Sequence, residues 1–256
     1  MGGVSIVSTS SRNSGESPDG ASPPASPDSP ATGSGIWSVF VSPARAFAGL
    51  RNRPQWFGPL IIAGAATALA QGWLVQAVGM QHVIATALRN SGSIDTVATV
   101  RNLTSNAAAV LTGQALAAVL GCFIAAVAMS CVLWLSAVVV GEQMRFRSLL
   151  SVVALAVFAY SVTRACMLVG TVGLAAHPER LNIKDPLATS VGYFVGPQTS
   201  GWMALYGSLD VLSIGAVLLL IQGLRIVGGL SWRRSVLAVG IPWVAYLLRG
   251  FIVAMV

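Results

Sequence analysis

Three ionisable side chains lie inside apolar stretches of the chain: Arg164, Asp210 and Arg249. Placing a lone charged side chain in a bilayer costs several kcal/mol. A charged residue inside a predicted span is therefore first considered as part of a functional site. Counted from the ends of the predicted spans, Asp210 and Arg164 lie about 12 Å, and Arg249 about 9 Å, below one membrane face. One carboxylate and two guanidiniums would therefore share a level in the leaflet on that side.

Three polar residues at a similar level offer further hydrogen bonds to these charges. They complete a candidate intramembrane polar cluster of Arg164, Asp210, Arg249, Tyr206, Tyr246 and Gln71. In one interpretation Asp210 pairs with one arginine to fix helix packing, while the other arginine reaches the headgroups. In the other, the cluster lines a polar pocket, open to the outer side, that holds an anionic headgroup or a solute.

Other residue types with chemical potential show no catalytic or metal-binding pattern. The cysteines fall in apolar runs without Cys-x-x-Cys spacing or a nearby histidine, so we interpret them as small buried hydrophobes: Cys122, Cys131 and Cys166. No paired acids, histidine cluster or Ser-Lys spacing appears within one predicted span. We therefore predict no enzyme activity, no catalytic residue, no cofactor and no metal site.

Composition shows which elements must position these residues. Hydrophobic residues make up 55% and charged residues 9% of the 256, and the mean hydropathy is +0.75. These values are typical of a membrane protein, and apolar runs of about 20 residues match a hydrocarbon core of about 30 Å. We predict an all-α, polytopic transmembrane helical bundle of five spans: 57–80, 119–140, 149–172, 202–227 and 235–255.

The apolar stretch 107–141 is too long for one span, at about 52 Å if wholly helical. We prefer residues 107–118 as a helical extension at the surface, although they could belong to the second span. Pro242 removes a helix donor inside the fifth span and is expected to kink it.

The amino-terminal part differs from the rest. Residues 1–35 are rich in Ser, Pro, Gly and Asp, which predicts a disordered tail. Residues 36–56 read as an amphipathic interfacial segment, with Trp37, Phe40, Ala44 and Phe47 at helical spacing. The basic residues of this segment could meet anionic headgroups: Arg45, Arg51 and Arg53.

Small residues at four-residue spacing form two stripes, which predict close helix packing or a homo-oligomeric interface. The first stripe is Gly64, Ala68 and Gly72, and the second is Ala117, Gly121 and Ala125. Other membrane proteins could also pack there.

The 15 basic residues are scattered in short loops and not clustered with aromatics, so we predict no nucleic-acid partner.

The positions of the basic residues predict the topology, with nine on one side of the membrane, four on the other side and two within spans. The side with more basic residues faces the cytosol, which predicts a cytosolic amino terminus and a non-cytosolic carboxyl terminus. Fourteen Arg to one Lys, with abundant Ala, Gly and Val, suggests a bacterium, hence the bacterial cytoplasmic membrane. The nine are Arg12, Arg45, Arg51, Arg53, Arg145, Arg147, Arg225, Arg233 and Arg234.

Several strings in this framework resemble the Yip domain (Ypt-interacting protein) family of membrane proteins. The resemblance covers about 37–256 and is most specific in the fourth predicted span. The strings are 42–47 and 53–60 at the entry to the first span, 141–154 at the second cytosolic turn, 185–187, and 209–213 with 221–224. Asp185 stands where the family usually has Asn.

The resemblance implies a membrane protein without agreed catalytic residues, so no site residue is transferred. Eukaryotic members are tied to vesicle traffic and small GTPases, and bacterial relatives have no settled biochemical role. We predict a non-enzymatic Yip-like membrane organiser or scaffold. The alternative is a small-solute, ion or lipid transporter or channel that uses the polar cluster, although five spans with a polar level off the midplane argue against it.

Overall fold

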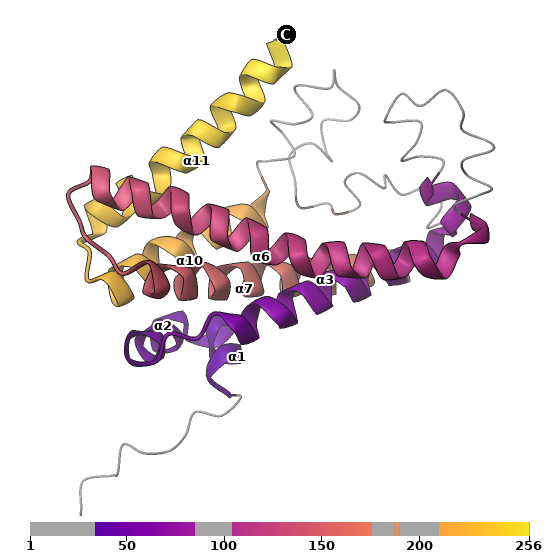
Figure 1. Ribbon diagram of the computed structural model, residues 1–256, viewed down its shortest axis with the longest axis horizontal. Coiled ribbons are helices and arrows are strands. Elements are labelled where there is room, and N and C mark those ends of the chain that lie inside the picture. Colours follow the sequence, from indigo (N-terminus) through magenta and orange to yellow (C-terminus); the bar gives the residue numbers. More distant parts are fainter. Residues whose placement is uncertain (1–33, 85–103, 176–186, 188, 190–209, 256) are drawn as a thin grey trace, which may run out of the picture. The chain divides into compact units, whose positions relative to one another are not determined.

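The computed structural model describes residues 34–84, 104–175, 187, 189 and 210–255. The predicted tail up to residue 33 therefore lies outside the described part. The named elements are all helices: α1 (Ser34–Val41), α2 (Pro43–Asn52), α3 (Phe57–Val78), α6 (Ala107–Val139), α7 (Phe146–Leu174), α10 (Val211–Gly228) and α11 (Trp232–Met255). They carry the labels of Figure 1.

Four of these helices, α3, α6, α7 and α10, are long and apolar enough to cross a membrane. Three follow the predicted spans closely or extend them, and the helix of the second span includes residues 107–118. The fifth predicted span corresponds to α11, a helix of 24 residues that continues on both sides of Pro242. Its crossing of the membrane stays a prediction.

Helix α7 is the centre of the bundle. It packs against α3, α6 and α10 and also against α1 and α2, as Figure 1 shows for its long neighbours. Every residue from Leu149 to Ala156 is buried. A helix that is apolar around its whole circumference is buried in this way, whereas an amphipathic helix buries one stripe.

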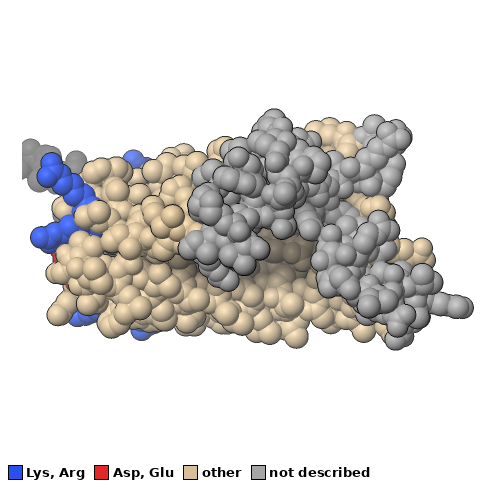
Figure 2. Space-filling view, turned by 90° about the horizontal axis from the view of Figure 1, so that it is seen from above, with Lys and Arg blue, Asp and Glu red and all other residues tan. Residues whose placement is uncertain are grey.

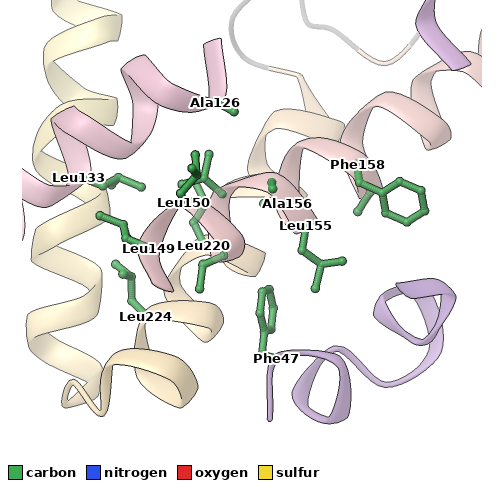
Figure 3. Close-up of a cluster of buried hydrophobic side chains, with 14 of the residues drawn as sticks. Phe47, Ala126, Leu133, Leu149, Leu150, Leu155, Ala156, Phe158, Leu220 and Leu224 are labelled. Carbon is green, nitrogen blue, oxygen red and sulfur yellow. The ribbon is translucent and has the colours of Figure 1, made fainter. Parts of the chain in front are cut away.

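The core at one end of the bundle joins residues that are far apart in sequence. Leu133 of α6, Leu149 of α7 and Leu224 of α10 are all fully buried in one cluster. Figure 3 shows that Phe47 of α2 points into the same cluster. The short amino-terminal helices are therefore part of the hydrophobic core.

The two stripes of small residues, one on α3 and one on α6, differ in whether they pack against a neighbouring helix. A Cβ at Gly64 would lie 2.8 Å from the Cα of Val119, so α3 and α6 approach closely there. The first stripe thus serves helix packing at Gly64. In the second stripe, Ala117 and Ala125 are exposed, and a Cβ at Gly121 would meet nothing within 4 Å among the described residues.

The interfacial segment differs from its prediction in one respect. Two helices, α1 and α2, occupy residues 34–52, and the basic side chains Arg45, Arg51 and Arg53 are exposed. Phe47, however, is 0% exposed and does not share a lipid-facing surface with Trp37 and Phe40. The chain is not helical at Ser42, so Phe47 lies on a different helix from Trp37 and Phe40, and the helical spacing expected across the segment does not hold.

Candidate functional site

Asp210, the only acid of the predicted polar cluster, lies at a helix end and not within a span. Its backbone is extended, and α10 begins at the next residue, Val211. The fourth predicted span, 202–227, is therefore not helical at Asp210, and residues 202–209 lie outside the described part. The Oδ1 of Asp210 accepts a hydrogen bond from the backbone N–H of Leu212 at 3.2 Å.

This contact makes Asp210 the N-cap of α10. A capping carboxylate satisfies one of the free N–H groups of the first helical turn and also interacts favourably with the helix dipole. The residue is 6% exposed, and the backbone N–H of Val211 bonds to the carbonyl oxygen of Thr189 at 3.2 Å. Asp210 thus has a local structural role that its predicted depth did not suggest.

Arg164 has a partner on its own helix. Its Nη1 donates to the hydroxyl oxygen of Tyr160, one turn earlier in α7, at 2.8 Å. Among the described residues, Arg164 and Asp210 form no salt bridge with each other. Tyr160 is not a member of the predicted cluster, although its spacing of four residues from Arg164 is the signal for such a pair.

The other members of the predicted cluster stay partly untested. Gln71 is half-buried in α3, and Tyr246 is 60% exposed on α11. Tyr206 and the side chain of Arg249 lie outside the described residues. The side-chain hydrogen bonds of Arg164 and Asp210 are local, and the cluster as a whole remains a prediction.

Two of the three cysteines also differ from their interpretation as buried residues. Cys122 is half-buried, whereas Cys131 and Cys166 are exposed on the surface of the described bundle. In a membrane, these two thiols would face lipid or another protein. Sequence alone could not distinguish these positions, because lipid and protein core are equally apolar.

A shallow groove runs between α3 and α6. It has a volume of about 380 Å³, and two carboxamide side chains, Gln76 and Gln114, lie among its otherwise apolar lining. Ala68 and Gly72 of the first small-residue stripe form part of it. The arrangement could accommodate an apolar molecule with a polar group.

A second group of polar residues lies where two turns meet. These residues were not predicted as a site from the sequence. The α6–α7 turn carries Glu142, Arg145 and Arg147, and the α10–α11 turn is flanked by Arg225, Arg233 and Arg234. We call these six residues the arginine clasp. The signal for this site in the sequence is the single acid Glu142 among the basic residues of the two turns.

Two glycines shape the turns of the clasp. Gly141 has a φ of 84° and Gly229 a φ of 70°, in the left-handed region that other residues seldom adopt. After Gly229, the N–H of Leu230 reaches back to the carbonyl oxygen of Leu224, which is a common way to end a helix. Each turn therefore reverses the chain within a few residues.

Three contacts hold the clasp together. Arg234 forms a salt bridge with Glu142 across 92 positions of sequence. Met144 lies against Gly228, where an added Cβ would be 2.5 Å from the Met144 Cε. Within the second turn, the guanidinium of Arg225 lies 5.2 Å from the ring centroid of Trp232, at cation–π distance.

The clasp is strongly basic. It contains five arginines and one carboxylate, and all five arginines are exposed. Figure 2 shows Lys and Arg gathered at one end of the described surface, over these turns, while the rest of that visible surface is largely uncharged. This segregation of charge is typical of a membrane protein whose two basic turns lie on the same side.

A comparison with models of protein families identifies the family of this chain. A model described as the Yip1 domain matches residues 37–254. The chain belongs to the Yip1 domain family. Together with its long apolar helices, this membership makes it an integral membrane protein. No curated protein matches it, and no solved structure does.

Within the Yip1 domain, the strings that carried the resemblance meet in space. Phe47 of the first string packs against Gly223 of the last, where an added Cβ would lie 3.0 Å from the Phe47 Cε1 and would collide with the Cγ1 of Val152. Val152 belongs to the string at the start of α7. Three separate sequence signals thus correspond to one packing contact.

Proposed function

We propose that this Yip1 domain protein is a non-enzymatic membrane organiser, whose α1–α2 helices act as a fixed wedge in the cytosolic leaflet. The observation that carries the proposal is the buried anchor of this pair. Phe47 is fully buried in the bundle core, whereas Phe40 is 45% and Val41 90% exposed. A helix pair that is anchored on one side and apolar on the other displaces lipid at a constant place beside the bundle.

The depth of the pair supports this reading. Val152, against which Phe47 packs, lies about 9 Å along α7 from its start, and Phe158, against which Trp37 and Phe40 pack, lies about 18 Å along it. With a headgroup layer of about 6 Å, these positions are about 3–12 Å below the boundary between headgroups and acyl chains. Interfacial helices bury their apolar face about 5–10 Å into the boundary between headgroups and acyl chains. The exposed Arg45, Arg51 and Arg53 of the pair are suited to anionic headgroups at that depth.

The aromatic side chains make the wedge stiff. Trp37 and Phe40 of α1 lie against Phe158 of α7, with ring centroids 5.2 Å and 5.9 Å apart. Such aromatic pairs contribute about 0.5–1.5 kcal/mol each beyond their buried area. A stiff inclusion in one leaflet favours membrane that is curved toward the other, which is how the chain would organise its surroundings.

The orientation required is the one inferred from the basic residues, with the amino terminus and the clasp cytosolic. The arginine content favours a bacterial cytoplasmic membrane. No catalytic step, cofactor or metal is part of the proposal, and a homo-oligomer or another membrane protein could share the exposed face of α6.

The test uses the full-length protein in vesicles of phosphatidylcholine and phosphatidylglycerol. Increasing amounts of the wild-type protein should reduce vesicle diameter or form tubules in electron micrographs. The double variant Phe40→Ser/Val41→Ser should lose most of this effect, because its wedge no longer inserts. Phe47→Ala, which removes the anchor, should weaken it as well.

The matched control is Leu69→Ser/Leu174→Ser, which changes two exposed apolar residues, 75% and 90% exposed, on α3 and α7. It should retain the effect on vesicle shape. Thermal unfolding of each variant separates a loss of shaping from a loss of folding. Equal vesicle diameters with wild type and Phe40→Ser/Val41→Ser would rule out the wedge.

The transporter alternative is favoured by one feature, the groove with Gln76 and Gln114. It predicts solute or ion flux across sealed proteoliposomes that decreases in Gln76→Leu/Gln114→Leu. The organiser proposal predicts no such flux.

A further inference from the structure

The arginine clasp holds more positive charge than the residues around it neutralise. Glu142 is paired with Arg234, and within the described part of the chain no other carboxylate lies in these turns. Arg145, Arg147, Arg225 and Arg233 therefore have no carboxylate partner among the described residues. Four exposed guanidiniums remain available for an anion.

The clasp lies at the level of lipid phosphates. The 29 residues of α7 extend about 44 Å, close to the thickness of about 40–45 Å of a bilayer with its headgroups. The first turn of α7, with Arg145 and Arg147, thus falls in one headgroup layer. Guanidinium groups bind phosphate oxygens through two parallel hydrogen bonds, which a lysine cannot do.

The four available arginines are divided equally between the two turns, and the two on each turn are called an arginine pair. Arg145 and Arg147 belong to the start of α7, and Arg225 and Arg233 flank the α10–α11 turn. The Glu142–Arg234 salt bridge and the Met144–Gly228 contact join the two turns. The two turns that carry these arginines are therefore joined to each other at two points.

We propose that the arginine clasp binds a lipid headgroup that carries two phosphodiesters, with one phosphate at each arginine pair. A lipid with two covalently linked phosphates loses the entropy of association once, whereas two monophosphate lipids lose it twice. Two adjacent phosphate sites therefore favour the lipid with two phosphates. The same charge without fixed geometry would bind both kinds of lipid in proportion to their charge. The clasp shares no residue with α1–α2, so this inference and the wedge can fail independently.

The experiment measures lipid selection by the full-length protein. The delipidated protein in detergent is incubated with cardiolipin and phosphatidylglycerol at equal phosphate, and the retained lipids are counted by native mass spectrometry. Wild type should retain cardiolipin over phosphatidylglycerol by at least about tenfold. Arg145→Gln/Arg233→Gln should lose this preference, because each phosphate position loses one guanidinium.

Two further variants separate geometry from charge. Arg89→Gln/Arg101→Gln removes the same number of charges on the predicted non-cytosolic side and should keep the preference. Glu142→Gln makes the clasp more positive but breaks the bridge between the turns, so the preference should decrease even if total anionic lipid increases.

Several results would overturn the proposal. These are equal retention of both lipids by wild type, equal losses in the two double arginine variants, or a stronger preference in Glu142→Gln. Displacement of cardiolipin by inorganic pyrophosphate at the lipid's own concentration would also overturn it, because the clasp would then recognise a soluble anion.

Discussion

The role of Asp210 depends on whether its carboxylate lies inside a helix or at its start. At the start of α10, it accepts a hydrogen bond from the Leu212 N–H and is almost completely buried. An intramembrane ion pair and a helix cap can both explain a lone acid in an apolar region. They make opposite predictions for an uncharged residue of the same shape.

We predict that Asp210→Asn destabilises the protein by less than about 0.5 kcal/mol and Asp210→Ala by about 1 kcal/mol, since Asn caps helices nearly as well as Asp does. Unfolding in detergent, followed by circular dichroism, gives both values. If the carboxylate instead neutralises Arg164 or Arg249, Asp210→Asn should cost about 1–3 kcal/mol, because a cation is left unpaired. Restoration of that loss by an added Arg164→Gln would support the ion pair.

At the scale of elements, α3 and α6 illustrate how one glycine in a stripe fixes the distance between helices. A Cβ at Gly64 would lie 2.8 Å from the Cα of Val119, whereas a Cβ at Gly72 would meet nothing within 4 Å among the described residues. Both glycines belong to the same helix and the same stripe. Only the first holds the two helices close together.

We predict that Gly64→Ala destabilises the protein by about 1–3 kcal/mol, because a methyl group beside a backbone atom forces the helices apart. Gly72→Ala is the matched control. It should be neutral or should stabilise the protein by up to about 1 kcal/mol, since alanine favours the helix. Thermal unfolding in one detergent compares the two, and equal effects would contradict the close approach of α3 and α6.

At the scale of the whole molecule, the main question is whether α11 crosses the membrane. Four described helices have the length and apolarity of spans, and α11 carries Arg233 and Arg234 at its start and Arg249 near its end. With five spans the termini lie on opposite sides, and with four they lie on the same side. The arginine clasp then marks the cytosolic side in either case.

We predict five spans, with the amino terminus inside the cell. In a variant without its three native cysteines, a cysteine added after Val256 should react with an impermeant maleimide from outside, and a cysteine at Gly35 should react only after lysis. A carboxyl-terminal cysteine that also requires lysis would show that α11 does not cross. Outside labelling at Gly35 would reverse the orientation.

The sequence by itself determined the class of the protein, the approximate positions of its long helices and its family. These follow from local properties, since an apolar run of sufficient length must form a helix in a bilayer to satisfy its backbone hydrogen bonds. The bounds of α3 and α7 agree with the predicted spans within a few residues. The family strings are local as well, so they could be recognised before the fold was known.

Tertiary structure alone decided which of these residues meet. Phe47 was expected on one helical face with Trp37 and Phe40, yet it lies on a separate helix and is buried, because α7 and α10 leave room for its ring at Gly223. Glu142 and Arg234 form a bridge although 92 positions separate them, and Asp210 caps a helix whose start the apolar pattern does not mark. In an apolar solvent, lipid-facing and core-facing residues are of the same types, so hydrophobic patterning cannot distinguish them and packing has to.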